Sequence, residues 1–141
     1  RKPMTSGISI GTGWPSIGDM RGKVLFFYAD SQGARAACVE GGAEASTRAI
    51  FASSRTGVDD AVFAVRDDPR DAATTADLAA GMIVRVRADA DLATSAAERD
   101  VALATGAQIV STDFPPTEPQ AGTGYFVEFP GDALARSRVA E

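Results

Sequence analysis

The sequence predicts an α/β fold in which parallel strands alternate with helices. Residues 81–115 read as strand, helix and strand in direct succession. Short apolar runs of strand length recur along the rest of the chain, and helix-length segments with capping residues separate them. Charged residues follow several of these runs, and parallel α/β folds keep their chemistry where strands end. Together these observations favour strand–helix units laid side by side in a parallel sheet.

Six apolar runs are candidate strands. A nearly continuous apolar run, KVLFFYAD, predicts a strand that is covered on both faces. A second run, MIVRVRA, alternates in the way that a strand with two different faces does. The complete set is 23–30, 49–52, 61–65, 82–88, 107–112 and 125–129.

Helices are predicted between these strands. Residues 14–23 predict a short helical turn, with Pro15 at its first position and Gly22 at its end. Residues 31–40 contain a helical core, and Thr74 to Asp77 look like the capped start of a helix that Gly81 ends.

The clearest helix signal is the capping box formed by Ser95 and Glu98. Gly106 is expected to end that helix, and Ala97, Val101 and Ala104 are expected to form its buried stripe. Small residues on this stripe indicate close packing against a sheet.

Composition limits the classes of function. The chain has 141 residues, of which 45% are apolar and 23% charged, as in an ordinary globular domain. The net charge of −5 argues against nucleic-acid binding. No apolar run is long enough to span a bilayer, and a single cysteine, Cys38, excludes an internal disulfide. The sequence has no histidine, which excludes a Ser/His/Asp triad within the chain.

Length and composition also suggest what kind of segment this is. A complete (β/α)₈ barrel needs about 250 residues, so this row of strand–helix units predicts half a barrel or a small doubly wound sheet. The chain starts with Arg1 rather than Met, as a mature or partial segment would. The abundance of alanine, arginine and aspartate fits a high-GC bacterial source.

The strand predicted over 82–88 carries the main candidate site residues. Its alternation places Ile83, Arg85, Arg87 and Asp89 on one face, and Val84, Val86 and Ala88 on the other. The valine face is suited to packing under helices. The two guanidinium groups could bind a phosphate, or they could form an internal ion-pair network with acidic neighbours.

Asp113 directly follows the next predicted strand. A carboxylate there could hold a cation or orient a base, and an ion pair with Arg85 or Arg87 is an equally open interpretation. Phe114 is expected in the core rather than in a pocket wall. Two other strand ends carry acidic residues: Asp30, which suits a helix cap, and Asp67 in Asp67-Asp68-Pro69, which suits a turn. Tyr28 and Tyr125 are expected to be structural, and Cys38 a buried small residue.

A family resemblance appears when the motifs are taken in order. The chain contains WPSIGDMRGKVLFF, then Asp-Asp-Pro after AVFAV, then GMIVRVRADAD, RDVALATGAQIVSTDFP and GTGYFVEFPG-(x)₃-AR. From about Trp14 to Arg136 it resembles the C-terminal half of the bacterial calcium-dependent phosphoinositide phospholipase C family. The pair GxIVRxRADAD and SGAQxVSTDxP carries most of the specificity.

The resemblance implies a half of a TIM barrel over residues 14–136, with a flexible lead-in at 1–13 and a tail at 137–141. It implies a secreted bacterial phosphoric diester hydrolase that cleaves a phosphodiester next to inositol and contacts a membrane surface transiently. In that family two histidines act as acid and base, and a calcium ion stabilises charge on the phosphoryl oxygens. The resemblance places the histidines and most calcium ligands in an N-terminal half that the 141 residues do not include.

Four residues carry over from the family's motifs as substrate-side residues without assigned roles: Arg85, Arg87, Asp89 and Asp113. Two departures stand out. Asp67 replaces the asparagine of an Asn-Asp-Pro motif, and Ser137-Arg138-Val139 replaces Cys-Asn-Pro, which suggests an altered or truncated terminus.

Three functions remain open. The first is the substrate-binding part of such a phospholipase C, with an N-terminal half-barrel that supplies acid, base and metal; the partner expected for the chain is that half-barrel or a second copy. The second is a non-catalytic half-barrel that dimerises or binds an anionic ligand. The third is a self-contained doubly wound hydrolase with a metal held by Asp30, Asp67 and Asp113.

Overall fold

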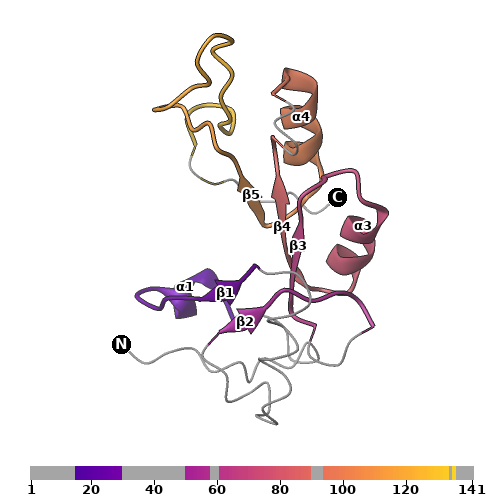
Figure 1. The fold of residues 1–141 in the computed structure, drawn as a ribbon. Helices are drawn as coiled ribbons and strands as arrows, with labels where there is room; N and C mark the ends of the chain where they lie inside the picture. The colour runs from indigo at the N-terminus through magenta and orange to yellow at the C-terminus, as the bar shows by residue number, and fades with distance from the viewer. Residues whose placement is uncertain (1–14, 30–49, 58–60, 90–93, 134, 136–141) are drawn as a thin grey trace.

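The computed structural model describes residues 15–29, 50–57, 61–89, 94–133 and 135, drawn in colour in Figure 1. Several predictions lie outside these residues: the lead-in at 1–13, Asp30, the helix at 31–40 with Cys38, and the tail at 137–141.

The described elements alternate largely as predicted. Their bounds are α1 Ile17–Met20, β1 Phe27–Tyr28, β2 Phe51–Ala52, β3 Phe63–Arg66, α3 Ala72–Ala79, β4 Ile83–Arg87, α4 Ala96–Ala104 and β5 Ile109–Ser111. All strand pairs are parallel, and each strand pairs with its neighbour in the sequence. The parallel α/β class is therefore confirmed.

The strands form two sheets, β1-β2 and β3-β4-β5, rather than one continuous barrel wall. Two hydrogen bonds join the segment after β2 to β3: Ser54 N–H donates to the Phe63 carbonyl at 2.7 Å, and Val65 N–H donates to Ser53 Oγ at 3.2 Å. The half of a TIM barrel that the sequence predicts is not confirmed by this arrangement.

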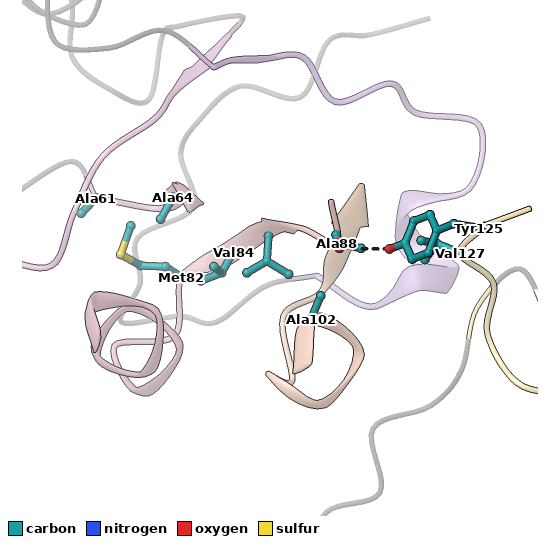
Figure 2. Close-up of a cluster of buried hydrophobic side chains, with 9 residues drawn as sticks. Ala61, Ala64, Met82, Val84, Ala88, Ala102, Tyr125 and Val127 are labelled. Atoms are coloured by element: carbon teal, nitrogen blue, oxygen red, sulfur yellow. Dashed lines mark hydrogen bonds between the residues drawn. The ribbon is translucent and has the colours of Figure 1, made fainter. Parts of the chain in front are cut away.

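The core lies between β4 and the two long helices. Val84 and Val86 are completely buried on one face of β4, where they cluster with Ala102 of α4. Leu78 of α3 packs against the same cluster. Both helices thus cover the same face of the three-stranded sheet (Figures 1 and 2). The predicted valine face is confirmed.

The predicted strand at 125–129 is wrong. Its backbone groups are used within the final loop instead of in a sheet: Tyr125 O accepts from Gln120 N–H at 2.8 Å, and Val127 N–H donates to Phe114 O at 2.9 Å. The apolar residues that suggested a strand are buried all the same, because Tyr125 and Val127 join the core cluster.

The first strand is much shorter than its apolar run. Only Phe27 and Tyr28 pair with β2, and in the described part of the chain Val24, Phe26 and Tyr28 keep one side of this run exposed. The expected cover on both faces is therefore not found there. Phe27 points the other way and stacks on Phe63, with ring centroids 4.1 Å apart.

Helix starts differ from the predictions in two of three cases. Ser16 rather than Pro15 sets the start of α1, because its hydroxyl accepts from Asp19 N–H at 3.2 Å. Asp71 caps α3 one turn earlier than predicted, and Thr74 lies buried inside the helix. A carboxylate three residues upstream was the stronger cap.

The capping box of α4 is confirmed, with Ser95 Oγ accepting from Glu98 N–H at 3.2 Å. Gly81 and Gly106 follow α3 and α4 with φ of 78°, a conformation that favours glycine. The predicted buried stripe of α4 is wrong, however. Ala97 and Ala104 are exposed, and the residue that meets the sheet is Ala102, so the helix is rotated about its axis relative to the prediction.

A buried ion pair ties α3 to the sheet. Asp77 is 1% exposed and accepts from Arg66 Nε at 2.8 Å and from both the N–H and the hydroxyl of Thr56. Because these donors belong to β3 and to the turn after β2, one carboxylate joins three parts of the fold. Within the described residues, no helix has the length and apolarity needed to cross a membrane.

Candidate functional site

The carboxyl ends of three neighbouring strands each carry an aspartate. Asp67 directly follows β3, Asp89 lies two residues after β4, and Asp113 lies two residues after β5. Because β3, β4 and β5 are parallel and adjacent, these carboxylates meet at the same edge of the sheet. We call Asp67, Asp89, Asp113 and the two arginines of β4 the carboxyl-edge cluster.

Arg85 and Arg87 lie on the face of β4 opposite the helices. Their side chains are 20% and 28% exposed, between fully buried valines. The register places Arg85 beside Val65 and Ile109, and Arg87 beside Ser111. The predicted arginine face is confirmed for these two residues.

Both arginines form ion pairs with strand-end carboxylates. Arg85 Nη1 donates to Asp67 Oδ1, and Arg87 Nη2 donates to Asp113 Oδ2. The carboxylates remain open to solvent, with side-chain exposures of 71% for Asp67 and 55% for Asp113. The ion-pair interpretation of the arginines and of Asp113 is therefore correct, and each pair keeps one accessible member.

Asp89 differs from its sequence-based placement. It is 0% exposed, and Ala88 before it is also buried, so the alternation of β4 ends in the turn at 88–89. One oxygen accepts from Arg87 Nε at 2.8 Å. The other accepts from Thr112 Oγ1 at 2.8 Å and from Asp113 N–H at 2.7 Å. Both carboxylate oxygens of Asp89 are thus engaged, and its side chain has no exposed surface in the described structure.

The electrostatics agree with these contacts. Burial by itself would raise the pKa of Asp89, but the hydrogen bonds from Arg87, Asp113 N–H and Thr112 lower the pKa of this carboxyl below its usual value. The hydrogen bond to Asp89 raises the pKa of Arg87 further, and the charge of Asp113 adds to that rise. The pair is therefore charged at neutral pH.

Thr112 and Tyr125 support the cluster, although neither residue is predicted from the sequence to belong to it. Thr112 Oγ1 donates to Asp89 and accepts from Phe114 N–H at 2.9 Å. Tyr125 Oη donates to the Ala88 carbonyl at 3.1 Å (Figure 2). The position of Thr112 directly before Asp113 could have indicated from the sequence that its hydroxyl belongs to the site. Tyr125 is 36 residues from Asp89, and only the fold brings these two residues together.

Phe114 and Asp68 behave as structural residues. Phe114 packs against the core cluster and meets Tyr125 edge to face, with centroids 6.0 Å apart. Asp68 Oδ1 accepts from Arg70 N–H at 2.8 Å in the turn after β3. The core and turn interpretations are thus confirmed for these positions.

The charge balance of the cluster determines what it can bind. Two guanidinium groups face three carboxylates, which leaves a net charge of −1. A simple anion would have to displace Asp67 or Asp113 from an arginine. A ligand with hydroxyl groups can instead accept from a guanidinium and donate to the carboxylate paired with it. The geometry therefore suits a polyhydroxylated group better than a bare phosphate.

The described part of the chain contains no group of three or more His, Cys, Asp or Glu side chains arranged to hold a metal ion. The cluster itself does not fit calcium. Asp89 has no free oxygen, and Asp67 and Asp113 are each bound to an arginine.

A comparison with protein families identifies one match. The family model described as phosphoinositide phospholipase C, Ca²⁺-dependent, matches residues 4–138, which is nearly the whole chain. No curated protein and no solved structure matches the chain at a significant level.

Proposed function

We propose that this chain, which belongs to the Ca²⁺-dependent phosphoinositide phospholipase C family, forms the headgroup-binding wall of a phosphoric diester hydrolase that cleaves a phosphodiester next to inositol. The observation that carries the proposal is the carboxyl-edge cluster. Two guanidinium groups are held at the ends of parallel strands, and each has an accessible carboxylate beside it. This pattern of donors and acceptors matches the adjacent hydroxyl groups of an inositol ring.

Roles within the cluster follow from exposure. Arg85 and Arg87 donate to headgroup oxygens, and Asp67 and Asp113 accept from headgroup hydroxyls. Asp89 holds Arg87 in place from the buried side. One interpretation of the sequence is that the arginines bind phosphate. We propose more specifically that they bind a headgroup that carries hydroxyls, because a bare phosphate would compete with the carboxylates already paired with them.

The chemistry itself needs groups that these residues do not supply. The sequence contains no histidine, and the carboxyl-edge cluster does not fit calcium. We assign the general acid, the general base and the calcium ligands to the N-terminal half of a barrel, and no reaction step is assigned to the residues of this chain. An N-terminal half would complete the site, whereas a second copy of this chain, which also lacks histidine, would give only a non-catalytic dimer.

Two features support the half-barrel. The strands β3, β4 and β5 follow one another in sequence order, and α3 and α4 both lie on the same face of their sheet (Figure 1). Strands in sequence order with their helices on one face are what a barrel wall requires, and one βαβαβ half of a doubly wound sheet shares this pattern. A bacterial, secreted enzyme that meets the membrane surface transiently fits the family resemblance.

Binding of myo-inositol 1-phosphate, measured by calorimetry, tests this proposal. Arg85→Gln and Arg87→Gln should each weaken binding about tenfold or more, the cost of one lost charged hydrogen bond. Arg99→Gln serves as the matched control, because Arg99 lies on α4 and pairs with Asp100 away from the cluster. Inorganic phosphate should bind more weakly than the inositol phosphate.

Two results would reject the proposal. One is an unchanged affinity for the inositol phosphate in both cluster variants. The other is parent protein that binds inorganic phosphate as tightly as it binds myo-inositol 1-phosphate, since the hydroxyl-binding role would then contribute nothing.

A further inference from the structure

The last described loop packs on the helix side of β4 and contacts Ala88, the residue before Asp89 of the carboxyl-edge cluster. Residues 114–127 close on themselves through the bond from Val127 N–H to Phe114 O, at 2.9 Å. From this loop the Tyr125 side chain reaches the end of β4, where its hydroxyl donates to Ala88 O (Figure 2). Tyr125 is only 9% exposed, so this bond is shielded from water.

Ala88 connects the end of the β4–β5 pairing to Asp89. Ala88 N–H makes the hydrogen bond to Ser111 O at 2.9 Å that lies beyond the last residue pair of β4 and β5. The carbonyl of Ala88 and the N–H of Asp89 belong to one planar peptide unit. A hydrogen bond that fixes this carbonyl therefore fixes the plane from which the Asp89 side chain departs.

A closed set of contacts results. Asp89 accepts from Thr112, Thr112 accepts from Phe114 N–H, the Phe114 ring meets the Tyr125 ring, and Tyr125 returns to Ala88 beside Asp89. Asp89 in turn holds the Nε edge of Arg87. The loop is thus connected, through Asp89, to a guanidinium that it does not touch in any described contact.

We propose that Tyr125 is a positioning residue: its hydroxyl, through the Ala88–Asp89 peptide, sets the orientation in which Arg87 meets a ligand. This inference rests on the proposed function only for the identity of the ligand. The orientation of Arg87 itself can be measured without one.

The test compares Tyr125→Phe with the parent protein by solvent exchange of arginine Nε–H groups in ¹H–¹⁵N spectra. The Arg87 signal is assigned from its absence in Arg87→Lys. We expect exchange at Arg87 to become about tenfold faster in Tyr125→Phe, as for one lost hydrogen bond. Arg66 Nε is the internal control, because it also donates at 2.8 Å to a buried carboxylate, that of Asp77.

Tyr28→Phe is the matched control variant, because Tyr28 is an exposed tyrosine on β1. Faster exchange at Arg87 with unchanged exchange at Arg66, in Tyr125→Phe and not in Tyr28→Phe, supports the inference. Equal acceleration at both arginines indicates general loosening and overturns it, and so does unchanged exchange at Arg87.

The same two variants are titrated with myo-inositol 1-phosphate. Tyr125→Phe should bind this probe about threefold to tenfold more weakly than the parent protein. If the parent binds no probe while Arg87 exchange responds as expected, the proposed function fails and the positioning role stands. If the parent binds and Tyr125→Phe binds equally well, the positioning role fails and the proposed function stands.

Discussion

Asp89 is the residue on which the candidate site depends most. It is a completely buried charge with three donors, and one of these donors is a guanidinium that reaches the accessible side of the sheet. A buried carboxylate is tolerable only when its partners replace the water that it has lost. Removing Arg87 leaves the buried carboxylate without its charged partner, and replacing Asp89 by an amide turns an NH₂ group toward donors that need an acceptor.

Asp89→Asn should therefore lower the free energy of unfolding by about 3 kcal/mol or more, as for a broken buried ion pair. Urea denaturation measures this loss. Asp100→Asn is the control, because Asp100 forms an exposed pair with Arg99 and should cost about 0.5 kcal/mol or less. Equal effects of the two substitutions would show that Asp89 is not held as described.

The lowered pKa of Asp89 predicts a dependence of stability on pH. A carboxyl whose folded pKa lies below its unfolded value of about 3.9 stabilises the protein above that value. This contribution is lost as the pH falls through the folded pKa. The parent protein should lose stability below about pH 4 more steeply than Asp89→Asn. Parallel slopes in urea titrations over this range would contradict the assignment.

The pKa of Tyr125 is shifted in the opposite direction to that of Asp89. Burial raises its pKa above the usual 10.0, and the nearby charge of Asp89 adds to the rise. The contribution of the protonated hydroxyl to stability is complete below about pH 10 and is lost as the pH rises through the folded pKa. A pH titration followed by tyrosinate absorbance should show a step for Tyr125 above pH 10, identified because it is absent in Tyr125→Phe. If the step that this substitution removes lies below pH 10, the buried position of Tyr125 is contradicted.

At the scale of elements, the helix caps explain both agreement and error. Ser95 is predicted correctly because its hydroxyl and Glu98 stand at the spacing of a capping box, whereas the neighbouring Thr94 has Ala97 at that spacing. For α3, Asp71 outcompeted the threonines because its carboxylate accepts from Ala73 N–H at 2.8 Å. A carboxylate also interacts favourably with the helix dipole.

The corrected start of α3 can be tested directly. Asp71→Ala should cost about 1 kcal/mol of unfolding free energy through loss of the cap. Thr75→Ala, at an exposed position inside the helix, should leave stability unchanged or raise it by about 0.5 kcal/mol, because alanine is the better helix former. Thermal unfolding of both variants tests the cap, and a loss in Thr75→Ala as large as that in Asp71→Ala would contradict a helix start at Asp71.

For the whole molecule, the described sheet is open rather than closed. In the described residues, β5 pairs with β4 on one side, and Ile109 of β5 is 38% exposed. Val24, Phe26 and Ile50 add further exposed apolar surface near β1 and β2. Surfaces of this kind favour association with another chain.

We therefore expect the isolated chain to associate with itself or with a complementary half-barrel, and not to hydrolyse phosphatidylinositol or bind calcium tightly. Sedimentation velocity measures the association, and phosphatidylinositol hydrolysis with and without calcium measures the activity. A stable monomer would contradict the open-sheet argument. Calcium-dependent turnover by purified 1–141 would contradict the assignment of acid, base and metal to another segment.

Local patterns in the sequence determined the parallel α/β class, the strand–helix–strand unit over 81–115, the capping box of α4 and the two faces of β4. Periodicity, caps and turn residues act over a few positions, so the sequence displays them directly. The family motifs pointed to Arg85, Arg87, Asp89 and Asp113 for the same reason, and the family is now established.

The tertiary structure decided which of these residues are exposed to solvent and which are buried. Burial and partner choice depend on segments far apart in the chain, and no local pattern encodes them. Residues 125–129 belong to a loop that packs on β4 rather than to a strand, and this packing places the Tyr125 hydroxyl against the Ala88 carbonyl. The turn after β4 buries Asp89, whereas Arg85, Arg87, Asp67 and Asp113 stay accessible. A buried carboxylate needs hydrogen-bond donors in place of water, and these donors come from segments that only the fold brings together.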